Sequence, residues 1–174
     1  MKKQLKKEID EHGFLIHTIN NYGNYKKDII ANIHTHGLIK SCSEFELLTI
    51  VTKFSCATVD ESYDVINKLG QKIRDGEIRL SDKKTYMING ILWGTVLTVD
   101  QEYLFGSYYE NYIMTPVYVL LPCYKGECDP NQLNDLEKKA LEKNYNEILN
   151  NYMILTNDAL FNPSKYLKME GITQ

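Results

Sequence analysis

The chain has 174 residues, of which 43% are hydrophobic and 25% are charged. This composition is typical of one soluble globular domain and excludes a disordered chain. Twenty basic residues against 23 acidic residues give a net charge of −3, so we expect no nucleic-acid partner. No apolar stretch approaches the roughly 20 residues of a membrane-spanning helix, and the charged N-terminus does not resemble a secretory signal. We therefore expect a cytoplasmic protein without a membrane partner. The abundance of Lys, Asn, Ile and Tyr suggests a bacterial or phage source with a low-GC genome.

The first third of the chain predicts a short helix followed by β-structure. Apolar residues at helical spacing before Gly13 predict a helix over residues 2–12. Residues 14–19 and 28–36 are rich in β-forming side chains and flank a turn-forming segment, which predicts a hairpin. Residues 44–54 favour a buried strand, and a helix over the same segment is the alternative.

The next segments predict one amphipathic helix and further strands. Thr58 followed by Glu61 is a capping-box pattern, and apolar residues then recur at helical spacing, so we expect a helix over 59–75. Residues 86–99 contain β-branched and aromatic side chains with two glycines, which indicates a strand pair or a kinked strand. Residues 115–124 are too apolar to have one face in water, which predicts a strand in the centre of a sheet.

A stripe of apolar residues near the C-terminus predicts a long helix over residues 131–153, and residues 157–174 favour an extended tail. No repeat or linker divides the chain, so we expect residues 1–174 to form a single domain. The element order predicts an α+β fold with a mainly antiparallel or mixed sheet, helices packed on one face and the long C-terminal helix.

Several short motifs resemble those of one bacterial family. Their order and spacing are similar to the family called domain of unknown function 4262, over roughly residues 8–132. The resemblance implies an α+β core but no particular reaction. The motifs that carry it are Ile9–Phe14, Thr35–Leu38, Ser43–Leu47, Arg74–Gly76, and Val117–Pro122 leading to Gly126 and Pro130.

The sequence departs from this family pattern at positions of chemical interest. His34 and His36 stand in a segment where the family has Tyr-Thr-Ile-Gly, and Cys123 stands where an acidic residue usually follows the strand. The long helix predicted over 131–153 lies largely outside the resemblance.

The histidines form the most distinctive polar pattern in the chain. All four precede residue 37, and His34 and His36 alternate along a predicted strand, so both imidazoles would point to one side. A His-x-His pair on a strand is similar to the first metal ligands of metal-dependent amidohydrolases. A complete site would have to recruit His12, His17, a carboxylate such as Glu44 or Glu46, or a cysteine. The alternative is that these histidines are hydrogen-bonded structural residues.

A tyrosine-rich segment is the second candidate site. Tyr108, Tyr109 and Tyr112 present large apolar faces with polar tips, which can bind a protein partner or stack on a small flat ligand. The alternative is that these side chains belong to the core.

The cysteines give weaker indications. Cys123 and Cys128 have a spacing that could hold zinc, but a core residue and a loop thiol are the favoured interpretation. Cys42 or Cys56 could act as a nucleophile only beside a base such as His34 or His36.

No complete catalytic set is present in the sequence, and phosphate-binding loops and serine-hydrolase motifs are missing. We therefore favour a non-catalytic binding or interaction protein, accessory or immunity-like, with a protein or small-ligand partner and no cofactor. The alternative is a metal-dependent hydrolase that uses His34 and His36 with zinc.

Overall fold

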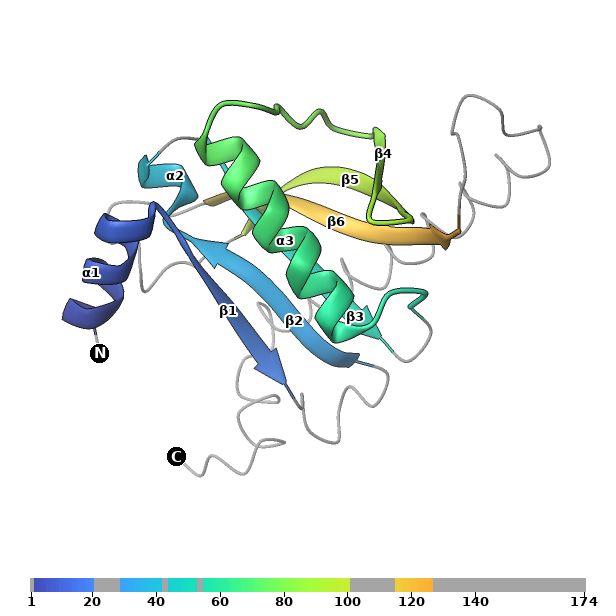
Figure 1. Ribbon diagram of the computed structural model, residues 1–174, viewed down its shortest axis with the longest axis horizontal. Coiled ribbons are helices and arrows are strands. Elements are labelled where there is room, and N and C mark those ends of the chain that lie inside the picture. The colour runs from blue at the N-terminus through green and yellow to red at the C-terminus, as the bar shows by residue number, and fades with distance from the viewer. Residues whose placement is uncertain (1, 21–28, 42–43, 53–54, 101–114, 127–174) are drawn as a thin grey trace.

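The computed structural model describes residues 2–20, 29–41, 44–52, 55–100 and 115–126, which form a mixed α+β fold (Figure 1). The elements in chain order are α1 (Lys2–His12), β1 (Leu15–Asn20), β2 (Ile29–His36), α2 (Leu38–Ser41), β3 (Glu46–Thr52), α3 (Val59–Arg74), β4 (Thr85–Ile88), β5 (Ile91–Asp100) and β6 (Thr115–Lys125). The predicted α+β class and mixed sheet are confirmed. The helix predicted over 131–153 and the tail over 157–174 lie outside the described residues.

The six strands form one sheet in the order β1-β2-β3-β6-β5-β4. Strands β3 and β6 pair in parallel, and every other neighbouring pair is antiparallel. The predicted central position of the 115–124 segment is confirmed, because β6 lies between β3 and β5. Its side chains from Val117 to Cys123 are all buried, as expected of a strand that is covered on both faces.

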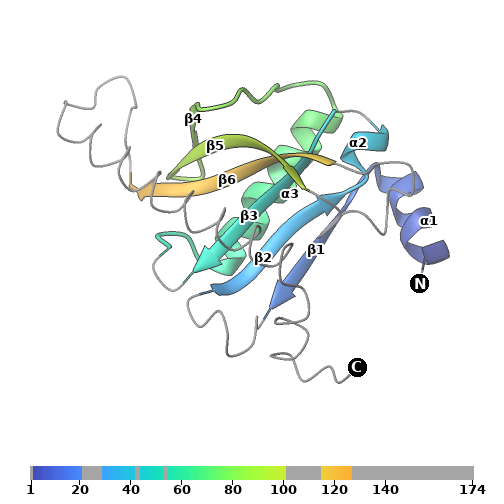
Figure 2. The same cartoon turned by 180° about the vertical axis from the view of Figure 1, so that it is seen from behind.

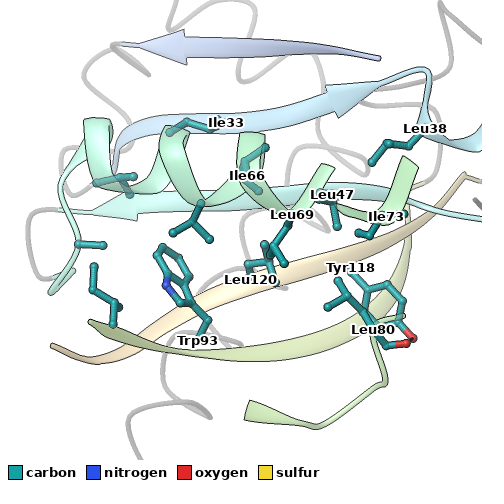
Figure 3. Close-up of a cluster of buried hydrophobic side chains, with 14 of the residues drawn as sticks. Ile33, Leu38, Leu47, Ile66, Leu69, Ile73, Leu80, Trp93, Tyr118 and Leu120 are labelled. Carbon is teal, nitrogen blue, oxygen red and sulfur yellow. Dashed lines mark hydrogen bonds between the residues drawn. The ribbon is translucent and has the colours of Figure 1, made fainter. Parts of the chain in front are cut away.

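Helix α3 covers one face of the sheet and contacts β1, β2 and β3 (Figure 1). The predicted capping box is present: Glu61 N–H donates to Thr58 Oγ1, and the Glu61 side chain accepts from the Thr58 N–H. The helix buries its apolar stripe against alternate residues of the strands. Figure 3 shows this core, which includes Ile33, Leu38, Leu47, Ile66, Leu69, Ile73, Leu80, Trp93, Tyr118 and Leu120.

Of the two structures predicted for residues 86–99, a strand pair and a kinked strand, the structure contains the strand pair, the hairpin β4–β5. Asn89 and Gly90 both have positive φ angles, 53° and 74°, and the residues on either side of them pair directly. These angles are those of the two-residue turn whose twist matches that of antiparallel strands. Gly90 thus marks the turn between the strands, whereas Gly94 lies inside β5.

Helix α2 is the described element that the sequence did not predict. It spans only four residues, which is too short to produce a helical period. It follows Gly37, whose φ of +107° directs the chain out of β2. None of the helices in the described part of the chain combines the length and the apolar character that crossing a bilayer requires.

Candidate metal centre

The candidate site lies on strand β2, on the face of the sheet opposite α3. Ala31 and Ile33 pack into the core beneath α3. Because side chains alternate along a strand, Asn32, His34 and His36 point to the other face, which Figure 2 shows in front of the helix. The prediction that His34 and His36 share one side of a strand is therefore confirmed.

The hairpin register brings a third histidine to this row. Strand β1 pairs with β2 so that His17 lies directly opposite His34. Directly opposed residues of antiparallel strands project to the same face, with Cβ atoms about 5 Å apart. The ring centroid of His17 is 5.1 Å from that of His34 and 5.9 Å from that of His36. Of the additional residues that the sequence analysis considered, the structure brings His17 into this cluster.

Two hydrogen bonds connect the polar row on β2. His34 Nδ1 lies 2.7 Å from Asn32 Oδ1, and His34 Nε2 lies 3.0 Å from His36 Nε2. Asn32 was not among the residues predicted from the sequence. The alternation Asn-x-His-x-His in a predicted strand was the signal that could have identified it, because the three side chains then share a face.

The site is buried at His34 and His36 and open at His17. His34 and His36 have 1% and 0% of their surface exposed, whereas His17 is exposed. Burial, followed by the influence of nearby His36 and His17, lowers the pKa of His34 to about 2. Burial, followed by the influence of His17, lowers the pKa of His36 to about 3. Both imidazoles are therefore neutral near pH 7, the state in which a histidine nitrogen can bind a metal ion.

The backbone around His36 is fixed by a buried carboxylate. Glu46 accepts hydrogen bonds from Thr35 Oγ1–H at 2.7 Å and from the backbone N–H of Gly37 at 2.9 Å, so both neighbours of His36 bind the same side chain. Glu46 also accepts from the N–H of Ile39 at 3.2 Å. The contacts described for this carboxylate thus hold the end of β2 and the start of α2.

The spacing of the imidazole nitrogens suits a transition-metal ion. In a tetrahedral zinc site with Zn–N bonds of 2.0–2.1 Å, two ligand nitrogens lie about 3.3 Å apart. The two Nε2 atoms of His34 and His36 are 3.0 Å apart, and one nitrogen from each of the three histidines lies within 4.8 Å of the others. A rotation of the exposed His17 side chain that brings its ring nitrogen roughly 1.5 Å closer to the nitrogens of His34 and His36 would complete the site.

The other predicted chemical groups of the described residues lie elsewhere. His12 ends α1 and lines a hollow of about 540 Å³ between α1, β1 and α3. Glu44 is exposed. Cys56 packs against the core beneath α3, and burial raises its pKa. Burial also raises the pKa of Cys123 to about 11, so this thiol is protonated at neutral pH, as the interpretation of a core residue requires.

Other candidates lie outside the described residues. These are Cys42, Cys128, and the three tyrosines Tyr108, Tyr109 and Tyr112. A zinc clip that includes Cys128 and a partner surface formed by the tyrosines therefore stay predictions.

Comparisons with protein-family models, curated proteins and solved structures found no match to this chain. The resemblance to domain of unknown function 4262 thus stays an expectation, and function has to be argued from the geometry of the site.

Proposed function

We propose that the protein binds a divalent transition-metal ion, with zinc as the reference ion, through the imidazoles of His17, His34 and His36. The convergence of these three rings at one point of the sheet carries the proposal. They come from two strands, and their positions follow from the pairing of His17 with His34.

The donor set favours particular ions. Three imidazole nitrogens without a carboxylate suit zinc, copper, nickel or iron, whereas magnesium and calcium prefer oxygen ligands. Because His34 and His36 are buried, an ion bound to their nitrogens would be shielded from bulk water on the side of β2. The exposed His17 would supply the third nitrogen from the solvent side.

The proposal is tested with protein purified without a histidine tag or a chelator. We expect elemental analysis to find one metal ion per chain, and titration of the metal-free protein to give one zinc site. His17→Ala should weaken zinc binding by more than about tenfold, because it removes a ligand. Since His17 is exposed, this variant should retain the fold.

His12→Ala is the matched control. It removes the other histidine of the chain, which lies on α1 outside the cluster, and should leave zinc affinity unchanged. Equal affinities of the wild-type protein, His17→Ala and His12→Ala, or the absence of a zinc site in the wild-type protein, would refute the proposal.

A metal-dependent hydrolase is the second candidate function, and the three ligands found among the described residues favour it over a structural metal site. Structural zinc sites use four protein ligands, whereas catalytic sites commonly use three and keep one position for water or substrate. We expect the zinc-loaded protein to hydrolyse an activated ester or phosphodiester, and His17→Ala to lose that activity. Zinc binding with no hydrolysis of either substrate would leave metal binding as the function and remove the hydrolase.

A further inference from the structure

A buried amide lies at one end of the polar row on β2. Asn32 is 4% exposed, and its Oδ1 lies 2.7 Å from Nδ1 of His34. On the other side of the same ring, His34 Nε2 lies 3.0 Å from His36 Nε2. Both nitrogens of His34 therefore have a partner, and the two partners constrain where its proton lies.

The chemistry of these groups assigns the tautomer. An amide oxygen accepts hydrogen bonds and does not donate them, so the Nδ1 of His34 must carry the proton. A neutral imidazole carries a proton on only one ring nitrogen, so Nε2 of His34 is unprotonated and has a lone pair. This atom faces His36. The Nε2–H of His36 is then the donor in the contact between the two rings.

The same hydrogen bond prepares His34 for a metal ion. Metal-binding histidines usually donate their second ring N–H to an oxygen, which fixes the ring orientation and raises the basicity of the ligating nitrogen. Asn32 and His34 are two residues apart on β2, so the side-chain period of a strand places the amide and the ring side by side on one face.

We propose that Asn32 is a positioning residue that holds His34 with Nε2 directed toward the metal ion. This inference rests on the proposed metal-binding function and adds a role for a residue that does not touch the ion. The amide supplies a neutral acceptor, so it orients the ring without adding a buried charge to the metal-free protein.

The test compares zinc affinity in three variants by competition with a chromophoric chelator. Asn32→Leu has a similar shape but no acceptor, and should weaken zinc binding by about 10- to 100-fold. Asn32→Asp keeps an oxygen acceptor and should bind zinc at least as well as the wild-type protein. Asn67→Leu, on α3, which covers the opposite face of the sheet from the cluster, is the matched control and should bind zinc normally.

A spectroscopic readout separates positioning from a general loss of structure. In the metal-free wild-type protein, long-range ¹H–¹⁵N spectra of the imidazoles should show His34 protonated at Nδ1. This measurement requires no variant, so it remains decisive even if Asn32→Leu fails to fold.

Three results would overturn the proposal: wild-type affinity in Asn32→Leu, an affinity of Asn32→Asp as low as that of Asn32→Leu, or His34 protonated at Nε2. These outcomes would leave the metal site itself in place. A wild-type protein that binds no zinc would instead refute the proposed function together with this inference.

Discussion

At the scale of single residues, His34 has polar neighbours on two strands. His17 lies opposite it on β1, Asn32 and His36 flank it along β2, and Leu48 of β3 lies on its other side. His34 therefore has a polar neighbour on β1 and an apolar neighbour on β3. The proximity of His17 and His36 to His34 thus follows from the register of β1 and the side-chain period of β2.

Glu46 holds the backbone at the end of β2 through hydrogen bonds from three donors. Glu46→Gln replaces one acceptor oxygen with an NH₂ group, which would face the donors Thr35, Gly37 or Ile39. We expect a loss of about 1–3 kcal/mol in the free energy of unfolding, measured by urea denaturation, because a buried polar group loses its partner.

Glu44→Gln serves as the control, because this nearby carboxylate is exposed. Its stability should stay within about 0.5 kcal/mol of the wild-type value. If the two variants were equally stable, the carboxylate of Glu46 would not hold the end of the strand.

At the scale of elements, α3 and the chain between α1 and β1 meet at a close contact. Gly70 is buried in α3, and a Cβ atom at this position would lie 2.6 Å from Cζ of Phe14. Gly70→Ala should therefore lower the free energy of unfolding by about 1–2 kcal/mol, although alanine favours a helix over glycine by about 1 kcal/mol.

The cause can be checked with a second substitution in the same contact. Phe14→Leu removes the ring that alanine would strike, so Gly70→Ala should cost less in that background than in the wild-type protein. Identical costs in the two backgrounds would show that the contact with Phe14 is not responsible.

The elements show how far the sequence alone predicts this fold. The capping box at Thr58 and the glycine after α1 predicted the two helices α3 and α1, and the strand-forming segments predicted the first hairpin and the central strand, because these signals are local. For the segment of β4 and β5 the sequence left open a strand pair or a kinked strand. Helix α2 has only four residues and depends on Gly37 and on Glu46, which follows it in the chain. No local pattern indicates such a contact.

The candidate site was only partly predictable for a related reason. His34 and His36 share a face because of the strand period, which the sequence contains. The place of His17 depends on the register of β1 against β2, and a slip of one residue would turn it to the other face. The ten residues between the paired Asn20 and Ala31 exceed the short loops whose turn type fixes a register.

At the scale of the whole molecule, the buried histidines link folding to pH. The pKa of His34 falls from 6.5 to about 2 and that of His36 to about 3 in the folded protein. Below pH 6.5 the unfolded chain therefore binds more protons than the folded chain. Stability should be fully present above this pH and should fall, by about 1.4 kcal/mol per pH unit for each histidine, as the pH decreases.

This pH dependence is measured by urea denaturation of metal-free protein between pH 7.5 and pH 5, with a chelator present. His34→Asn should reduce the slope below pH 6.5 by about one proton, whereas His12→Ala should leave it unchanged. A wild-type stability that is constant over this range would contradict the neutral, buried state of the two rings.

The central claim is that three imidazoles from two strands bind one ion, and long-range ¹H–¹⁵N spectra of the histidine rings test it most directly. With one equivalent of zinc, we expect a ring nitrogen of His17, His34 and His36 to shift together, while the His12 signals stay in place. A spectrum that zinc leaves unchanged, or in which only one of the three rings responds, would contradict the account.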